Sequence, residues 1–558
     1  MENIKEELKK VVAGDVADTP TEIDIHSHDA SLFEVKPRVV VFPKNVEDLK
    51  HLVTFANDHD GVALSVRAAG TGMDGGALTE SVSIDSTKYL NHVSDAQDYT
   101  DPTNPVIKGS IKTQPGAYYR DFEKKTLARD LLMPSYPASR ELCSVGGIIS
   151  NNSGGELTLR YGKTEDYIRS LKVIFADGNE YEVRPLSMDE LNAKMAQGDF
   201  EGDLYKKVFE LVSNNYDLLQ NAKPKVSKNS AGYYLWNVYD KEKGVFDLTK
   251  LITGSQGTLG IVTEVDFKLI RPLKHSQMMV LFLDDLSRLG DLTLEVLKHN
   301  PTTFESYDDK TLRLAVKFAF ELMKKLGIKN LFTLAWNGIP EAWSIIRKGF
   351  PKLVLQITFD GDDPVELEKK AQQLAIDLQD YSPRYLEVIK NPQEAKEYWL
   401  IRRESFNLLR HKTKGKNAAA FIDDIIVPPA CLPEFFPKLN AILDQYKQYM
   451  IYNIAGHIGN GNFHIIPLMD LSLPEVRKII PEIAEKVYTL VFEYGGSMTG
   501  EHNDGIMRTP FLPQQYGVEV CRLFRELKEI FDPREIFNPG KKTAGTLEYA
   551  ASKLKTHN

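Results

Sequence analysis

Residues 67–77 read RAAGTGMDGGA and stand between two short runs of strand-forming residues, LSVR at 64–67 and SVSIDS at 81–86. Glycine permits a positive φ and a close approach of the backbone, so this loop can turn its amide groups toward an anion such as a pyrophosphate. A dinucleotide-binding loop of the Rossmann type also requires a helix directly after the glycines. A strand pattern follows here instead, which argues against a Rossmann fold.

Three more glycine-bearing segments follow along the chain: PSYPASRELCSVGGIISNNSGG at 134–155, RYG at 160–162 and TGSQGTLG at 253–260. Any one of them alone is more commonly a tight turn than a ligand site. The residues between them predict short elements: a strand at 38–42, an amphipathic helix from Asn45, and a hairpin over 168–183 that turns at Asp177-Gly178. This alternation to about residue 275 predicts an α+β domain.

The second half has a different pattern. Strand-then-helix units at 278–297 and 352–379 predict a second α+β domain, with an antiparallel sheet covered on one face. A third strand-like run, AAAFIDDIIVPP at 418–429, precedes a predicted helix at 433–446. We therefore expect three segments, which are 1–275, 276–499 and a C-terminal segment 500–558.

Composition limits the class of protein. The chain has 558 residues, 42% apolar and 26% charged, which is typical of a globular protein with several domains. The net charge of −9 argues against nucleic-acid binding. Three separate cysteines, Cys143, Cys431 and Cys521, exclude a disulfide framework and an iron–sulfur cluster held by this chain alone.

The lack of a recognisable targeting signal predicts a cytoplasmic protein. No apolar run is long enough for a transmembrane helix, and MENIKEELKKVVAG at the N-terminus does not have the pattern of a signal or transit peptide. The basic run HKTKGK at 411–416 is either a solvated loop or a docking site for an acceptor protein or for the inner face of the membrane.

Two clusters in the second half carry possible metal ligands, GHIGNGNFH at 456–464 and GEHNDG at 500–505. Two imidazoles and one carboxylate, from His457, His464 and Glu501, suit Zn²⁺ or Mn²⁺ with open coordination positions. Gly-Asn-Gly-Asn opposes a helix, so we expect two strands joined by a tight turn that brings both imidazoles to one side. The alternative is that these histidines only cap turns or complete core hydrogen bonds.

The glycine-rich set, with PRVVVFPKNVEDLKHLV at 37–53 and TGSQGTLGIVTEV at 253–265, resembles the FAD-binding domain of the vanillyl-alcohol oxidase / p-cresol methylhydroxylase flavoproteins over roughly residues 35–270. This resemblance implies two α+β subdomains that hold FAD between them. Covalent members carry a His or Cys in these loops, whereas the first loop here offers Thr71, Met73 and Asp74, so we expect non-covalent FAD. The residues expected to bind FAD are Arg67, Ala69, Gly70, Thr71, Gly72, Met73, Gly75, Gly76, Ala77, Pro137, Ser139, Val145, Gly146, Asn151, Gly155, Tyr161, Gly162, Gly257, Ile261, Val262 and Asn538.

HIGNGNFH, GGSMTGEHNDG and FDPREIFNPGK at 531–541 resemble the C-terminal domain of FAD-linked D-2-hydroxyacid dehydrogenases. This resemblance implies that His457, His464 and Glu501 bind a divalent metal and that His502 is the catalytic base, neutral at its ordinary pKa of ~6.5. It also implies a carboxylate-binding arginine in the W-x-x-R context, for which Arg402 and Arg403 are the candidates. A solvated helix face is the alternative reading for that pair.

The family resemblance implies oxidation of a D-2-hydroxy acid to the 2-oxo acid, with electrons passed to FAD. Ile422 stands where D-2-hydroxyglutarate dehydrogenases carry a lysine, which favours a substrate such as D-lactate over D-2-hydroxyglutarate. Glycolate is a further alternative, as are a redox-neutral transferase like alkyl-dihydroxyacetonephosphate synthase and a flavin-binding assembly subunit. The electron acceptor is expected to be a quinone, a cytochrome, an electron-transferring flavoprotein or an iron–sulfur subunit.

Overall fold

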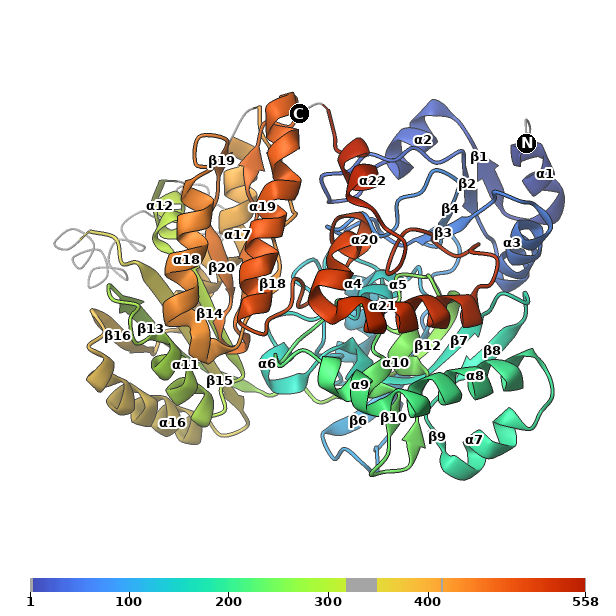
Figure 1. Ribbon diagram of the computed structural model, residues 1–558. Coiled ribbons are helices and arrows are strands. Elements are labelled where there is room, and N and C mark those ends of the chain that lie inside the picture. Colours follow the sequence, from blue (N-terminus) through green and yellow to red (C-terminus); the bar gives the residue numbers. More distant parts are fainter. Residues whose placement is uncertain (1–3, 318–348, 413–414, 557–558) are drawn as a thin grey trace.

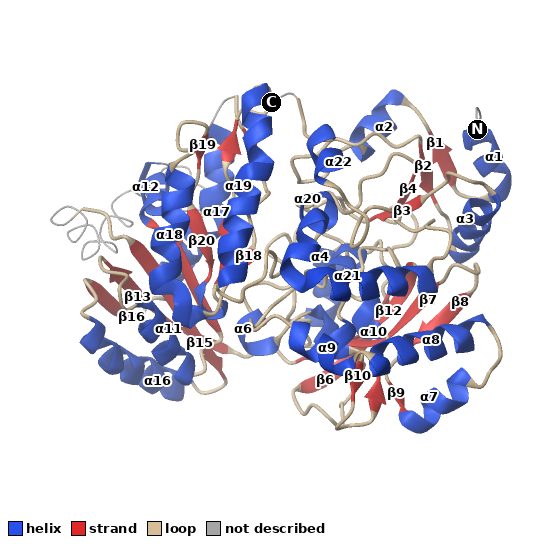
Figure 2. Cartoon of the chain, in the orientation of Figure 1, coloured by secondary structure: helices blue, strands red, loops and turns tan. Residues whose placement is uncertain are grey.

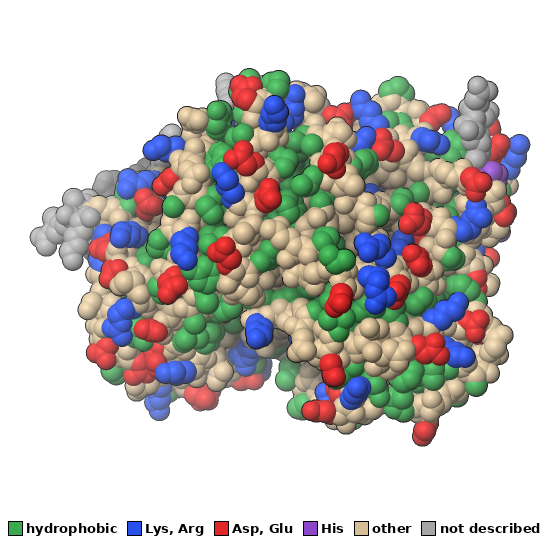
Figure 3. Space-filling model, in the orientation of Figure 1, with side chains coloured by type: hydrophobic (Ala, Val, Ile, Leu, Met, Phe, Trp, Pro, Cys, Tyr) green, Lys and Arg blue, Asp and Glu red, His purple; other side chains and the backbone are tan. Residues whose placement is uncertain are grey.

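The computed structural model describes residues 4–317, 349–412 and 415–556 (Figure 1). The first half of the chain forms the right-hand part of the view, and most of the second half forms the left-hand part. The C-terminal segment then crosses back to pack on the first half. On the face shown in Figure 3, basic and acidic side chains are interspersed, without a continuous basic region.

A small sheet begins the fold, with strand order β1-β2-β4-β3. Its strands are β1 (Asp15–Ala17), β2 (Val39–Phe42), β3 (Leu64–Arg67) and β4 (Val82–Asp85), and its helices are α1 (Ile4–Val11), α2 (Pro20–His26) and α3 (Val46–Asp58). Helix α3 begins where the sequence predicts, because the Asn45 side chain accepts a hydrogen bond from Asp48 N. Leu49, Leu52 and Val53 on its inner face are buried against the sheet.

A five-stranded antiparallel sheet follows, in the order β5-β6-β12-β7-β8. Its strands are β5 (Gln97–Asp98), β6 (Ile107–Thr113), β7 (Ile168–Ile174), β8 (Glu180–Val183) and β12 (Ile261–Ile270). The hairpin predicted over 168–183 is confirmed as β7–β8, and Gly178 in its turn has φ +80°. The helices of this region are α4 (Tyr119–Leu127), α5 (Val145–Asn151), α6 (Thr158–Tyr161), α7 (Met188–Met195), α8 (Phe200–Asn214), α9 (Tyr216–Ala222) and α10 (Thr249–Ile252), beside a minor sheet of β9 (Leu186–Ser187), β10 (Tyr239–Asp240) and β11 (Val245–Phe246).

The largest sheet has seven antiparallel strands in the order β16-β13-β15-β14-β20-β21-β18 (Figure 2). They are β13 (His275–Leu283), β14 (Thr303–Asp308), β15 (Leu353–Gly361), β16 (Tyr385–Ile389), β18 (Ile425–Ile426), β20 (Ile454–His457) and β21 (Asn462–Ile465). A minor sheet beside it contains β17 (Asn417–Ala418), β19 (Met450–Ile451) and β22 (Leu468–Met469). The chain changes sheet between Ile270 and His275, at the boundary that we propose between the first two segments.

Two predictions from the sequence were wrong: that this sheet is covered on one face only, and that residues 418–429 form one strand. The outer face of the sheet packs on α11 (Leu289–Lys298), α16 (Pro364–Asp377), α18 (Leu432–Asp444) and α19 (Pro474–Glu493), but its other face is covered too, by α12 (Asp309–Lys317) and α17 (Pro392–Lys412). In the run 418–429, only Ala418 and Ile425–Ile426 lie in strands. The residues between them are buried but leave the ladder, because the Asp423 and Asp424 carboxylates bind the segment at 499–508.

The last segment contains α20 (Gly505–Arg508), α21 (Leu512–Phe531) and α22 (Leu547–Ser552). It returns to the first half, where Asn538 Nδ2 donates hydrogen bonds of 2.7 Å to both Gly76 O and Gln256 O. Across the described ranges, no helix has the length and apolar character required to cross a membrane. The basic run 411–416 lies partly outside the described residues.

Candidate active site

The predicted hairpin around Gly-Asn-Gly-Asn is confirmed. Strands β20 and β21 pair antiparallel and are joined through Gly461 at φ +72°. A side chain at Gly461 would collide with the carbonyl of Val427, so the turn requires glycine on both conformational and steric grounds. The hairpin brings the His457 and His464 rings together, with centroids 5.1 Å apart and planes perpendicular.

Glu501 joins these two histidines from the C-terminal segment. Its Oε1 lies 3.4 Å from His457 Nε2, and ligand atoms of His457, His464 and Glu501 all lie within 4.8 Å of one another. The structure therefore brings together the three residues predicted as metal ligands.

Each histidine is held through Nδ1, which leaves Nε2 to face the cluster. Nδ1 of His457 lies 2.6 Å from Glu305 Oε1, and Nδ1 of His464 lies 3.0 Å from the carbonyl of Asp423. Metal-binding histidines are commonly oriented in this way by a carboxylate or carbonyl. Burial, together with His457 and His502, lowers the pKa of His464 to about 4, which favours the neutral ring that a cation requires. The donor set therefore fits a divalent cation.

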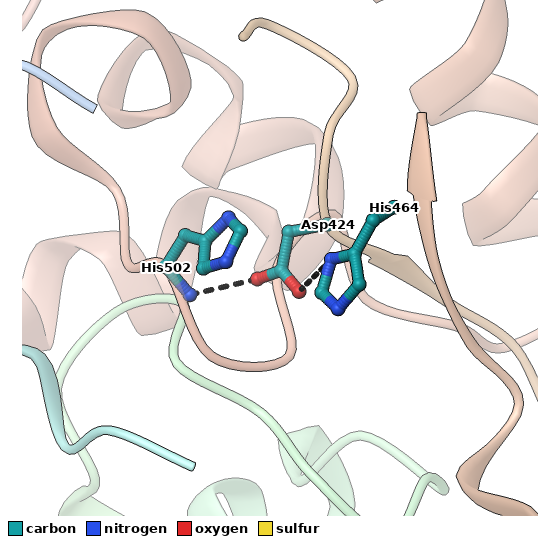
Figure 4. A group of neighbouring side chains, drawn as sticks. All are labelled: Asp424, His464 and His502. Atoms are coloured by element: carbon teal, nitrogen blue, oxygen red, sulfur yellow. Dashed lines mark hydrogen bonds and ion pairs between the residues drawn. The ribbon is translucent and has the colours of Figure 1, made fainter. Parts of the chain in front are cut away.

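A second group, Asp424, His464 and His502, also lies within metal-binding distance (Figure 4). Both oxygens of its carboxylate are already engaged, whereas Glu501 pairs through Oε1 alone within the described part of the chain. Asp424 Oδ2 accepts hydrogen bonds from Thr499 Oγ1 and from the backbone N–H groups of Glu501 and His502, and Oδ1 accepts one from Asn462. We therefore assign Asp424 a positioning role and keep His457, His464 and Glu501 as the candidate metal ligands.

His502 is oriented by a buried ion pair. Its Nδ1 lies 2.5 Å from Asp423 Oδ2, while Asp423 Oδ1 binds the guanidinium of Arg508. The Asp423 and Arg508 side chains are fully buried. Burial alone would lower the pKa of His502, but the carboxylates of Asp424 and Asp423 outweigh it and raise the pKa to about 9. Without a cation, the pKa of His502 therefore lies above the value near 6.5 that was expected from the sequence. A divalent cation bound at the neighbouring ligands would disfavour the imidazolium form of His502.

The two candidate arginines on α17 separate in space. Arg402 reaches the cluster, since its Nε and Nη2 lie 3.1 and 3.0 Å from Glu305 Oε2, the carboxylate that also holds His457. Arg403 points elsewhere: it pairs with Glu156 and lies over the Trp399 ring. Adjacent residues on a helix project about 100° apart, so only one of the pair faces the cluster.

The predicted FAD loops lie side by side. Ala69 N donates to Ser144 Oγ at 3.1 Å, while Gly254 N and Gln256 N donate to the carbonyls of Ile149 and Ser150 at 2.8 and 3.0 Å. Asn538 bridges the first and last of these loops, as described above. Gly155 packs on Tyr136 and Pro137, the Tyr161–Gly162 segment ends α6, and Ile261 and Val262 begin β12.

The first loop has two features that suit a bound anion. Gly70 and Gly75 have φ +68° and +77°, and the Arg67 side chain packs where a Cβ of Gly70 would lie. Arg67 is buried, and its Nη1 has no hydrogen-bond partner among the described residues. A buried donor without a partner is costly unless a ligand such as a pyrophosphate completes it. These residues therefore fit FAD.

Asp74 lies in the first loop, between Met73 and Gly75. Its carboxylate is engaged by the backbone N–H of Gly76 and by Gln256 Nε2, and its carbonyl accepts from Ile506 N. Asp74 therefore ties the loop to the C-terminal segment.

Sequence reasoning missed five residues of this cluster: Lys228, Glu305, Asp423, Asp424 and Arg508. Lys228 is fully buried, and its ammonium contacts Glu501 Oε1 and lies 3.3 Å from Asn462 Oδ1. Burial raises the pKa of Glu501, but Lys228 and His457 outweigh this and hold the pKa well below the usual range. One signal was available, because two adjacent aspartates inside the apolar run 418–429 imply buried carboxylates with partners.

Comparison with known protein families identifies both halves. Residues 37–184 match the model described as "FAD binding domain", and residues 273–542 match "FAD linked oxidases, C-terminal domain". The chain belongs to the FAD-linked oxidases. This family assignment confirms the predicted resemblance for most of the chain.

Curated relatives of this FAD-linked oxidase are distant but extensive. A D-2-hydroxyglutarate dehydrogenase of Pseudomonas putida is 25% identical over 92% of this chain and 49% of its own length. The glycolate oxidase subunit GlcD of Bacillus subtilis is 25% identical over 93% and 91%, and a D-lactate dehydrogenase of Archaeoglobus fulgidus is 26% identical over 90% of each chain. This chain spans about half the length of the D-2-hydroxyglutarate dehydrogenases that it matches.

Solved structures confirm the fold. A 4-ethylphenol oxidase from Gulosibacter chungangensis superposes with a TM-score of 0.66 at 15% identity, covering 98% of both chains. An alkyldihydroxyacetonephosphate synthase gives 0.63 at 17% identity, covering 96% of this chain and 85% of that one. The predicted α+β architecture, a two-subdomain FAD-binding domain of the vanillyl-alcohol oxidase type with a second α+β domain, is thus correct.

Proposed function

We propose that this FAD-linked oxidase oxidises a D-2-hydroxy acid to the corresponding 2-oxo acid. The observation that carries this proposal is the position of the His457–His464–Glu501–His502 cluster against the predicted flavin loops. Asn503 Nδ2 donates to Gly254 O at 2.9 Å, and a Cβ at Gly154 would lie 3.4 Å from Glu501 Oε1. The residues proposed to act on the substrate hydroxyl therefore lie next to the predicted flavin loops.

The chain's own residues supply three roles, and bound FAD supplies a fourth. His457, His464 and Glu501 hold a divalent cation, Zn²⁺ or Mn²⁺, which when bound lowers the pKa of the substrate hydroxyl. Bound FAD provides the acceptor for the hydride from the substrate carbon. His502, with Nδ1 fixed on Asp423, receives the hydroxyl proton at Nε2. Arg402 binds the substrate carboxylate through the guanidinium N–H groups that do not face Glu305.

We propose a monocarboxylic substrate, of which D-lactate is the simplest. Ile422, at the position where the resemblance implies a lysine for D-2-hydroxyglutarate, is fully buried among apolar residues. No cation for a second carboxylate therefore comes from that position. Glycolate and D-2-hydroxyglutarate, which appear in the names of the relatives, are the alternatives to test.

Electrons must leave the flavin for a separate acceptor. Cys143 and Cys521 are buried and Cys431 is partly exposed, and the three are far apart in the chain. We therefore propose that a quinone, a cytochrome, an electron-transferring flavoprotein or an iron–sulfur subunit receives them.

Anaerobic flavin reduction tests the function. The FAD-loaded protein is mixed with D-lactate, L-lactate, glycolate or D-2-hydroxyglutarate, and the flavin absorbance near ~450 nm is followed without oxygen. We expect bleaching by D-lactate and not by its L-enantiomer. A flavin that no 2-hydroxy acid reduces would favour the redox-neutral transferase whose fold this chain shares, and the proposal would be withdrawn.

Replacement of His457 with alanine tests the cation site. Metal content per FAD, measured by elemental analysis, should fall by about 10-fold or more because one of three protein ligands and its Glu305 contact are lost. His51, an exposed histidine on α3, provides the control, and His51→Ala should retain the metal. An unchanged metal content in His457→Ala would remove His457 as a ligand.

A further inference from the structure

A cavity of about 280 Å³ lies at the seam between the two halves of the molecule. It is lined on one side by the end of β12 and the residues before α6, and on the other by β13, β14, β15 and α17. Tyr136, Tyr161 and Trp399 form aromatic walls, and Thr303 and Thr358 form part of the floor. An apolar cavity of about 150 Å³ is already large enough to hold benzene, so this one has room for an organic side chain.

On both sides of the cavity, a lining residue lies two positions from a residue that contacts the candidate active site. On β14, Thr303 lies two residues before Glu305, so their side chains are neighbours on one face of the sheet. Glu305 holds both His457 and Arg402. On the opposite wall, Glu156 lies two residues after Gly154, which approaches Glu501.

The charges around this cavity are balanced. Arg403 pairs with Glu156 through two nitrogens: Nη2 lies 2.7 Å from Oε1, and Nε lies 3.2 Å from Oε2. Tyr136 Oη donates to the same carboxylate at 3.3 Å. The remaining lining includes the carboxylate of Asp360 and the ammonium of Lys274. Two carboxylates thus accompany two cations, so the cavity offers no excess positive charge to a second carboxylate of a substrate.

We propose that this cavity holds the substituent on the hydroxyl-bearing carbon of the substrate and selects an uncharged apolar or aromatic group. This inference rests on the proposed function and extends it: the preferred substrates are D-2-hydroxy acids with larger side chains, such as D-2-hydroxy-4-methylpentanoate or D-3-phenyllactate. D-Lactate is the smallest member of this class. The Glu156–Arg403 pair disfavours dicarboxylates because the charge of Arg403 is balanced by Glu156, whose carboxylate lines the cavity and repels a second substrate carboxylate.

The substrate comparison uses the FAD- and metal-loaded protein with an artificial electron acceptor, and kcat/KM is measured for four D-2-hydroxy acids. We expect the 4-methylpentanoate and phenyl compounds to exceed D-lactate by about 10-fold or more, since each methylene that a fitted pocket buries contributes such a factor. D-2-Hydroxyglutarate should fall below D-lactate. If D-lactate reduces the flavin but the larger compounds give no gain, the proposed function stands and this inference is overturned.

Two variants then test the cavity itself. Ser276 lines it from an exposed position, and Ser276→Trp should fill it and lower the ratio of kcat/KM for D-3-phenyllactate to that for D-lactate by about 10-fold or more. Ser552→Trp, at the exposed end of α22, is the matched control and should retain the wild-type ratio. Equal ratios in Ser276→Trp and the control would overturn the assignment.

Glu156→Gln should free Arg403 for a substrate carboxylate. We expect kcat/KM for D-2-hydroxyglutarate to rise by about 10-fold or more, the value of a charge-assisted pair in a partly enclosed site. The double variant Glu156→Gln/Arg403→Met should lose this gain, which separates a new ion pair from a general loosening of the pocket. A gain that persists in the double variant, or no gain in Glu156→Gln, would overturn the role of the pair.

Discussion

Replacement of His502 with alanine should lower the rate of anaerobic flavin reduction by about 10²–10⁴-fold, the usual contribution of a positioned acid–base group. The FAD content should stay at the wild-type level, because the predicted flavin loops are held by Asn503 and Asn538 rather than by the His502 ring. Stopped-flow absorbance with D-lactate measures the rate, and the absorbance spectrum measures the bound flavin.

His51→Ala is the matched control for this experiment, since His51 is an exposed histidine on α3. It should reduce its flavin at the wild-type rate. A His502→Ala variant that does the same would eliminate His502 as the proton acceptor. Loss of FAD in that variant would show instead that His502 holds the cofactor.

Removal of Arg508 should be the most destabilising single change at the site. Arg508 and Asp423 are both fully buried, so Arg508→Met leaves a buried carboxylate without its guanidinium. Breaking one partner of such a pair costs about 3–5 kcal/mol in the free energy of unfolding, whereas removing both charges costs less. Urea unfolding should therefore show Arg508→Met to be less stable than the double variant Asp423→Asn/Arg508→Met.

Flavin reduction should respond differently from stability. The double variant regains stability but not rate, because His502 has lost the carboxylate that fixes its ring. Lys268→Met on β12 provides the control. It breaks the ion pair of Lys268 with the buried Asp101, which is not part of the cluster. It should lose stability while reducing its flavin normally. A double variant that reduces flavin at the wild-type rate would contradict the positioning role of Asp423.

The candidate metal ligands show which contacts can be predicted from a short segment of sequence. Gly-Asn-Gly-Asn excludes a helix and permits a tight hairpin, so the approach of His457 and His464 follows from residues within one short segment. Their partner Glu501 lies more than thirty residues later, and its arrival was predicted only through the family resemblance. The contact of Glu501 with His457 depends on the C-terminal segment crossing back over the first half (Figure 1).

The buried carboxylates show where local sequence fails. The run 418–429 has the composition of a strand, yet Asp423 and Asp424 leave the ladder to bind His502, Arg508 and the backbone at Glu501. The composition of a run predicts that it is buried, but it does not predict which polar groups its carboxylates will bind. Arg402 and Arg403 illustrate the same limit, because they are adjacent residues of one type and only the direction of each side chain separates them.

The sequence by itself therefore determined the FAD-linked oxidase family, the α+β class, the order of the glycine-rich loops and the hairpin that carries His457 and His464. Each of these depends on residues close together in the chain or on motifs in a preserved order. The tertiary structure alone decided which arginine faces the cluster, which carboxylates orient His457 and His502, and where a cavity for the substrate side chain lies. Those features join residues that are far apart in the chain, from 79 positions for Asp423 with His502 to 247 for Glu156 with Arg403. Local propensity carries no information about such contacts.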